Sequence, residues 1–139
     1  AWGPAGGRLL LAIRDESAAQ KAARLARENG ESEPLLPVVI DRLQFKEDGV
    51  GYLDRSRRHY YVQEGRLDEA KQLTFGDYDD YEGAWSPDGA RIAFASNRTN
   101  EPDGNVNTDI WTAEIGRAGK AHPPSRVTDN PGTDATPSW

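Results

Sequence analysis

The residue best suited to chemistry in this sequence is Ser86, which opens the tetrad Ser86-Pro87-Asp88-Gly89 directly after a tryptophan. A catalytic serine needs a general base within hydrogen-bond reach, and it often lies in a G-x-S-x-G elbow, a pattern that this sequence lacks. Proline at the second position and glycine at the fourth are typical of a type I turn. We therefore expect Ser86 and Asp88 to hydrogen-bond the turn backbone, and we assign no catalytic residue.

Two stretches carry enough oxygen side chains to bind a cation. Between Asp103 and Glu114 they follow nearly the spacing of an EF-hand calcium loop, but Thr108 occupies the position where the sharp turn needs glycine. A polar hairpin tip leading into a strand at Asp109 explains the same residues, and we prefer it. The acidic loop at residues 77–82 could hold a cation or a substrate amine, although most such runs are solvated loops.

The basic and imidazole groups give a weaker signal. Cysteine is absent and His59 and His122 are the two histidines, so a zinc site is unsupported. The basic cluster at residues 55–59 is interpreted as a solvated hairpin end whose arginines could pair with the acidic loop at 77–82. Residues 97–99 form an Asn-Arg-Thr glycosylation sequon, which occurs often by chance. We expect neither a metal nor a cofactor.

Charge and composition limit the classes of partner. The chain has 139 residues, a formal net charge of −6 and an isoelectric point near 4.9, so nucleic acid is not an expected partner. No apolar run approaches the roughly 20 residues that a membrane helix needs. Together with the absence of cysteine, this leads us to expect a cytoplasmic protein. The lack of any methionine leads us to expect a piece of a longer or processed chain.

An internal repeat sets the organisation of the chain. Residues 2–12 match residues 85–95 in their Trp, Pro, Gly and Arg positions, and residues 126–139 parallel residues 72–85. In the second repeat, from Trp85 to Trp139, the pattern predicts four strands, at about 83–86, 91–96, 109–115 and 125–128. A turn is expected at 87–89 and a polar loop at 97–108. Four short antiparallel strands in about 40–50 residues are typical of a β-propeller blade, so we predict an all-β fold.

The first repeat, from Trp2 to Trp85, is too long for one plain blade, and two interpretations compete. It could be two blades, the second beginning at Phe45, or one blade with an insertion. Residues 16–30 favour the insertion because they are alanine-rich and helical in pattern, with Asp15 or Ser17 as N-cap and Gly30 as the stop. A hairpin is expected at 38–54, turning at Asp48-Gly49. The outer strands of the blade are then expected at 58–64 and 71–75.

The predicted chain is thus a partial propeller over residues 1–139, with about two four-stranded blades. The first blade covers 1–83 with an insertion at 16–54, the second covers 84–128, and 129–139 begin the next. Closed propellers typically have 4–8 blades, and an open two-blade sheet would leave unpaired edges. We therefore expect an internal slice of a larger ring.

These motifs resemble a known family. Residues 84–98, "AWSPDGARIAFASNR", followed by "DIWTAE" at 109–114, are similar to the repeat shared by TolB-like propellers and by the propellers of prolyl oligopeptidase-family serine peptidases. Residues 38–62 and 72–89 resemble, more specifically, the acylaminoacyl-peptidase or dipeptidyl aminopeptidase-like members. The acidic turn residue of the motif is replaced by Ala5 in the first repeat.

The resemblance implies an N-terminal propeller that restricts access to a C-terminal α/β-hydrolase domain bearing a Ser-Asp-His triad. No residue of the triad motif occurs in this chain, so the expected role is non-catalytic gating of peptide substrates. The implied partners are the hydrolase domain, the remaining blades and peptide substrate, and a homo-oligomer of the parent is left open. The inserted helix and hairpin could reach the active-site cleft or a neighbouring subunit. Two alternatives remain: a TolB-like propeller that binds proteins, and a calcium-binding module at 103–114.

Overall fold

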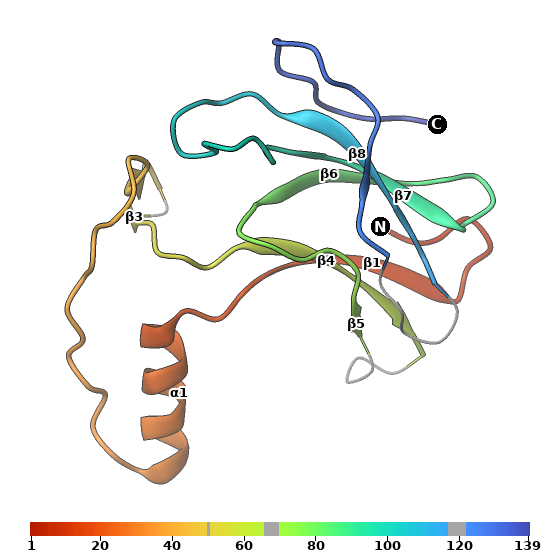
Figure 1. The fold of residues 1–139 in the computed structure, drawn as a ribbon. Helices are drawn as coiled ribbons and strands as arrows, with labels where there is room; N and C mark the ends of the chain where they lie inside the picture. Colours follow the sequence, from red (N-terminus) through yellow and green to blue (C-terminus); the bar gives the residue numbers. More distant parts are fainter. Residues whose placement is uncertain (50, 66–69, 117–121) are drawn as a thin grey trace. The chain divides into compact units, whose positions relative to one another are not determined.

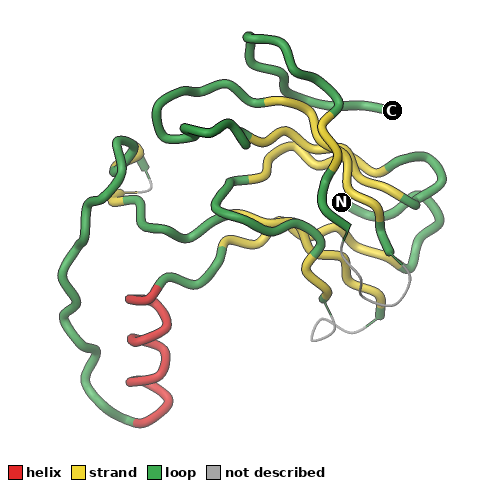
Figure 2. The backbone as a smooth tube through the Cα atoms, viewed as in Figure 1, coloured by secondary structure: helices red, strands yellow, loops and turns green. Residues whose placement is uncertain are grey.

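The computed structural model describes residues 1–49, 51–65, 70–116 and 122–139. Within these residues it contains antiparallel sheets and a single short helix, so the prediction of an all-β fold is confirmed (Figures 1 and 2). The chain divides into two compact units. One combines Ala1–Ile13 with Arg57–Trp139, and the other is Arg14–Ser56. No helix among the described residues is long and apolar enough to cross a membrane.

The first unit contains a four-stranded antiparallel sheet in the order β6-β7-β8-β9. Its strands are β6 (Asp80–Trp85), β7 (Arg91–Ser96), β8 (Asp109–Glu114) and β9 (Ser125–Arg126). The four predicted strands are therefore present in the predicted order, and β7 has the predicted bounds. Strand β6 begins earlier than expected and crosses the blade boundary predicted between residues 83 and 84. Strand β9 is shorter than expected, and the connection before it includes residues 117–121, which lie outside the described part.

The same unit contains a second sheet in the order β1-β4-β5. Its strands are β1 (Arg8–Arg14), β4 (Arg58–Glu64) and β5 (Lys71–Gln72), and a bridge from Trp2 to Leu9 extends it beyond β1. Strand β4 matches the prediction at 58–64, whereas β5 covers only the first residues of the predicted 71–75. The connection between β4 and β5 includes residues 66–69, which the structure does not describe.

The two sheets repeat the same hydrogen bonds at their first turn. The backbone N–H of Gly3 donates to the carbonyl of Arg8 at 2.9 Å. At the matching place in the second sheet, the N–H of Ser86 donates to the carbonyl of Arg91, also at 2.9 Å. The internal repeat found in the sequence is therefore a repeat of backbone geometry.

The outer strands of the two sheets are also equivalent. The N–H of Tyr60 donates to the hydroxyl of Thr74 at 2.9 Å, and the N–H of Ile110 donates to the hydroxyl of Thr128 at the same distance. These threonines follow Leu73 and Val127, so the apolar-Thr pair in the sequence marks the end of the outer strand in both repeats.

The hydrophobic core of this unit is assembled from both sheets. Strand β7 is buried at five successive residues, from Ile92 to Ser96, so both of its faces are covered. Tyr60 and Phe94 bring the two sheets into contact, with ring centroids 5.9 Å apart and ring planes inclined at 59°. The buried cluster comprises Leu10, Tyr60, Val62, Leu73, Ile92, Phe94 and Ala113.

The second unit, Arg14–Ser56, contains helix α1 (Ala18–Asn29). Ser17 is its N-cap and forms a capping box with Gln20, while Gly30 ends the helix at a φ of 72°. Ser17 is thus the N-cap of the two candidates, Asp15 and Ser17, and Gly30 is the predicted stop. The predicted hairpin is reduced to β2 (Lys46–Glu47) and β3 (Gly51–Tyr52), with Val50 outside the described residues.

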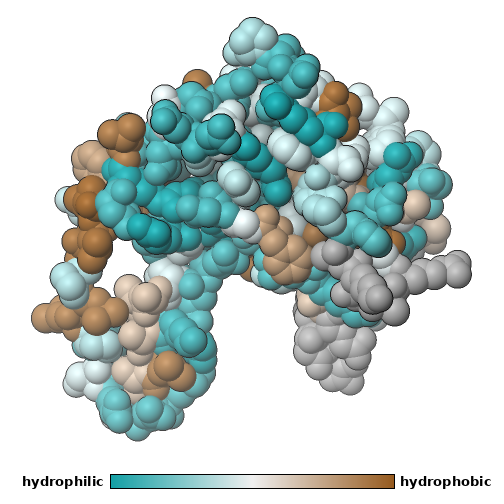
Figure 3. Space-filling model, in the orientation of Figure 1, coloured by the Kyte–Doolittle hydropathy of each residue, from teal (hydrophilic) through white to brown (hydrophobic). Residues whose placement is uncertain are grey.

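An apolar stretch without regular structure joins the helix to this hairpin. Its large side chains are exposed, as the hydrophobic surface in Figure 3 shows. They are Leu35, Leu36, Val38, Val39, Ile40, Leu43 and Phe45.

Candidate functional site

The structure places Ser86 in the predicted turn. The N–H of Gly89 donates to the carbonyl of Ser86 at 2.8 Å, and the Ser86 hydroxyl donates to the Asp88 carboxylate at 2.6 Å. The N–H of Arg91 donates a hydrogen bond to Ser86 Oγ at 2.9 Å. Ser86 is 1% exposed, so its oxygen is closed to substrate and serves the turn.

Removal of this hydroxyl should affect stability alone. We expect Ser86→Ala to lower the free energy of unfolding by about 1–3 kcal/mol, because buried backbone groups would lose their partner. Urea denaturation of the variant measures this, with the exposed Ser32→Ala as the matched control. An unfolding free energy of Ser86→Ala equal to that of Ser32→Ala would contradict this structural role of Ser86.

The turn also makes stability depend on acid. The Ser86 hydroxyl, helped by the N–H of Ala90, lowers the pKa of Asp88 below its ordinary value of 3.8. The ionised carboxylate therefore stabilises the fold above pH 3.8, and this contribution is lost as the pH falls through the lower pKa of the folded state. We expect Asp88→Asn to lose stability at neutral pH. Its free energy of unfolding should then fall less than that of the wild type as the pH is lowered. Urea midpoints from neutral to acid pH test this; parallel curves for the two proteins would contradict it.

A group of charged side chains gathers where β4 and β6 begin and just after β7 ends. We call it the sheet-end cluster. It comprises Arg57, His59, Asp77, Asp79, Asp80 and Arg98.

Arg57 joins the basic and acidic stretches of the sequence. Its guanidinium lies 2.8 Å from the Asp77 carboxylate and 3.1 Å from that of Asp79. Burial opposes the charge on Arg57, but the two carboxylates outweigh it and raise the pKa of Arg57. The hypothesis that arginines of residues 55–59 pair with the acidic loop is thus confirmed for Arg57. The interpretation of 55–59 as a solvated end is wrong for Arg57 and His59, whose side chains are 14% and 3% exposed.

The buried half of the cluster centres on Asp80, which is 0% exposed. Its Oδ1 accepts a hydrogen bond from Arg98 at 2.8 Å, and its Oδ2 lies 3.4 Å from His59 Nδ1. The Arg98 guanidinium lies 5.1 Å from the ring centroid of Tyr78 and 5.4 Å from that of Trp111. The histidine and carboxylate resemble half of a triad, but His59 is 2% exposed and closed to substrate. Through Arg57 and His59, the cluster links the start of β4 to the acidic residues at the start of β6.

The stretch at 103–114, weighed as an alternative calcium site, continues into a strand at Asp109. Asp109 lies in β8 and its carboxylate accepts a hydrogen bond from Arg126 at 2.8 Å, while Glu114 ends the same strand. No group of three or more metal-ligating side chains occurs in the part of the chain that the structure describes. The strand at Asp109 favours the interpretation of this stretch as a hairpin tip.

Asparagine side chains organise the loop between β7 and β8. The Asn97 amide nitrogen donates to the carbonyl of Asn105 at 2.9 Å, and its oxygen accepts from the Thr99 hydroxyl at 2.8 Å. The nitrogen of the sequon is therefore engaged within the loop. His122, the second histidine, is exposed.

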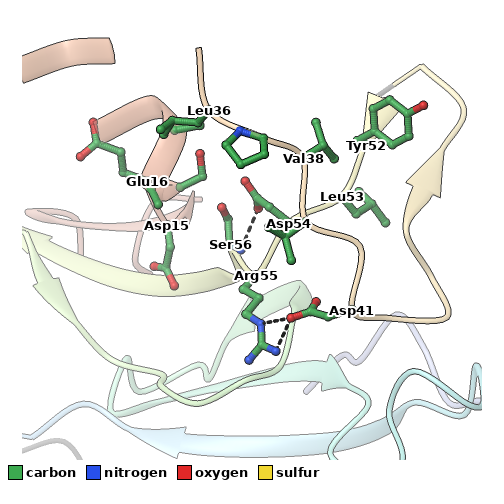
Figure 4. A pocket seen from close by; sticks show the side chains of 15 residues that line it. Asp15, Glu16, Leu36, Val38, Asp41, Tyr52, Leu53, Asp54, Arg55 and Ser56 are labelled. Carbon is green, nitrogen blue, oxygen red and sulfur yellow. Dashed lines mark hydrogen bonds and ion pairs between the residues drawn. The ribbon is translucent and has the colours of Figure 1, made fainter. Parts of the chain in front are cut away.

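The second unit contains a pocket of about 570 Å³ (Figure 4). Its acidic side chains already have partners: Arg55 donates to Asp41 at 2.8 Å, and the N–H of Ser56 donates to Asp54 at 2.8 Å. Burial opposes ionisation of Asp54, but hydrogen bonds from Ser56 and the nearby helix cap outweigh it, so the pKa of Asp54 is lowered. The pocket therefore offers mainly its apolar wall, made by Leu36, Pro37, Val38, Val39 and Leu53.

The described residues define an all-β chain of two repeated sheets with a helix-bearing second unit, in which the side chains best suited to chemistry serve turns and ion pairs. The chain is similar to an uncharacterized peptidase, YuxL, of Bacillus subtilis (strain 168), with 27% identity over 110 residues. The match covers 79% of this chain and 16% of the relative, so the chain spans about a sixth of that peptidase's length. No protein-family model matches the chain.

Proposed function

We propose that this chain is a non-catalytic β-propeller segment of a cytoplasmic serine-type peptidase that hydrolyses acylaminoacyl or oligopeptide substrates. Its role is to gate substrate access to a C-terminal α/β-hydrolase domain outside these residues. The observation that carries the proposal is the similarity to a peptidase over 79% of the chain. A match over 110 residues is much longer than one short motif.

The repeated sheets support the propeller architecture. In each, a Trp precedes the first tight turn, and the two sheets make equivalent hydrogen bonds at that turn and at the outer strand. One sheet has four strands, and the other has three strands extended by the Trp2–Leu9 bridge. Four-stranded antiparallel sheets that repeat along the chain stack around an axis in propellers. The partners are then the neighbouring blades, the hydrolase domain and the peptide that passes between them.

The buried side chains support a gating role over a catalytic one. Ser86 and His59 are both closed to solvent, and each has a structural partner. A rigid scaffold with loops at its edges suits selection of substrates by size. The second unit, Arg14–Ser56, adds an apolar pocket that a repeat of this kind does not need for its own sheet. We propose that this unit contributes to the selection.

Deletion of the second unit tests the gating role. The full-length protein and a variant with residues 14–56 replaced by a short glycine linker are compared on a short acylaminoacyl substrate and on a long unfolded peptide. We expect kcat/KM for the short substrate to persist and the preference for short over long peptides to fall. Unchanged length selectivity with an unchanged oligomeric state would contradict the proposal. Circular dichroism confirms that the variant is folded.

A further inference from the structure

Trp85, which opens the second sequence repeat and ends β6, docks on the first repeat. The indole Nε1 of Trp85 donates to the carbonyl of Ala1 at 3.1 Å. The Arg8 guanidinium lies over the same ring, 5.6 Å from its centroid. Gly3 lies directly beneath, and a Cβ at that position would be 3.6 Å from the indole. One carbonyl and one arginine therefore form a receptor for the tryptophan.

Trp139 repeats this arrangement on the second repeat. Its Nε1 donates to the carbonyl of Ala84 at 3.1 Å, and the Arg91 guanidinium lies 5.0 Å from its ring centroid. The receptor positions are equivalent in sequence. In each repeat the carbonyl belongs to the residue before the opening tryptophan, and the arginine follows that tryptophan by six residues.

A second contact marks the same junction. Glu82 and Thr136 each lie three residues before a docked tryptophan, and each has a positive φ, of 52° and 49° respectively. The Glu82 carboxylate accepts a hydrogen bond from the N–H of Thr136. A strained backbone that recurs at equivalent positions indicates a built junction between consecutive repeats.

The third opening tryptophan, Trp2, is 73% exposed. Its backbone pairs with Leu9, but its indole is presented to solvent. The receptors at Ala1 and Ala84 are occupied by Trp85 and Trp139. Trp2 thus has the side chain of the junction without the receptor. A docked indole buries apolar surface and makes a hydrogen bond through its N–H. An exposed ring gains neither.

We infer that Trp2 docks on a receptor of the same kind in a further four-stranded repeat of the same protein. That repeat supplies a backbone carbonyl for the indole N–H and an arginine for the ring face. A second copy of this chain is disfavoured because both receptors of each copy are filled by its own tryptophans. The inference uses the repeat architecture of the proposed function but not its peptidase chemistry.

Hydroxyl-radical footprinting of the full-length protein tests this inference, with oxidation of each tryptophan measured by mass spectrometry. Trp85 is the internal standard for a docked ring, and the urea-unfolded protein is the standard for exposure. We expect Trp2 to be protected several-fold relative to the unfolded protein, as Trp85 is, at every protein concentration. Oxidation of Trp2 at the unfolded rate would overturn the inference. Protection that disappears on dilution would also overturn it, because it would assign the receptor to a second copy.

A pair of variants gives an independent readout. We expect Trp2→Ala and Trp85→Ala both to lower the melting temperature of the full-length protein. Tyr52→Ala, which removes another exposed aromatic ring, is the matched control and should change little. Equal effects of Trp2→Ala and Tyr52→Ala would contradict docking. Neither readout depends on peptidase activity, so failure here and failure of the proposed function are distinguishable.

Discussion

Gly83→Ala should be among the most destabilising single substitutions in the described residues, with a loss of roughly 3 kcal/mol in the free energy of unfolding. A Cβ at Gly83 would lie 2.6 Å from Tyr60 Cζ and 2.8 Å from its hydroxyl oxygen. The Tyr60 ring belongs to the buried core, so it has no free direction in which to move. The N–H of Gly83 also donates to the Tyr60 hydroxyl at 2.5 Å, and displacement of the ring would lose this bond.

Urea denaturation followed by tryptophan fluorescence measures the effect of Gly83→Ala. Gly104→Ala is the control, because the nearest atom to its Cβ would be 3.6 Å away, and it should cost less than about 1 kcal/mol. The double variant Gly83→Ala/Tyr60→Ala should lose less stability than the sum of the losses of the two single variants. This is expected because Tyr60→Ala removes the ring with which the new Cβ clashes. Equal effects at Gly83 and Gly104 would show that the two sheets are not in contact there.

Asp80→Ala should cost about 3–5 kcal/mol, because it leaves the Arg98 guanidinium buried without its carboxylate. The Arg98 side chain is 8% exposed and the Asp80 side chain 0%. Water therefore cannot replace the missing partner. The second variant Asp80→Ala/Arg98→Met should recover part of the loss, since it removes the uncompensated charge.

The control for this prediction is Asp77→Ala in the same cluster. Asp77 pairs with Arg57 at 2.8 Å, but its side chain is 64% exposed. We expect its removal to cost less than about 1 kcal/mol, as for most exposed ion pairs. Thermal or urea unfolding of both variants distinguishes them. An Asp80→Ala loss no larger than that of Asp77→Ala would mean that the buried Asp80–Arg98 pair contributes no more to stability than an exposed ion pair.

Local signals in the sequence predicted a large part of the fold. Ser17 and Gly30 bound the helix because their capping chemistry acts within a few residues. The Ser86 turn follows from the same kind of local chemistry. The repeat then placed the outer strands, since the apolar-Thr pair recurs where each ends. Whether these sheets are propeller blades stays a prediction.

Local sequence signals could not predict contacts between residues that are distant in the sequence. Asp80 meets Arg98 and His59 at sequence separations of 18 and 21, and no period or turn motif marks them. The predicted hairpin at 38–54 is shorter than its apolar pattern suggested. Its two strands pair over two residues each, and the apolar side chains before Lys46 are exposed instead of paired. The clash that excludes a side chain at Gly83 also depends on a ring from the other sheet.

We propose that these residues belong to a serine peptidase without supplying its nucleophile, and covalent labelling is the experiment that tests this. The full-length protein is treated with a fluorophosphonate, and the modified serine is located by peptide mass spectrometry. We expect a single labelled serine beyond Trp139, within a G-x-S-x-G sequence, and a loss of peptide hydrolysis in proportion to the labelling. Labelling of Ser86 would contradict the proposal. The absence of any labelled serine in the full-length protein would also contradict it and would favour a protein-binding propeller.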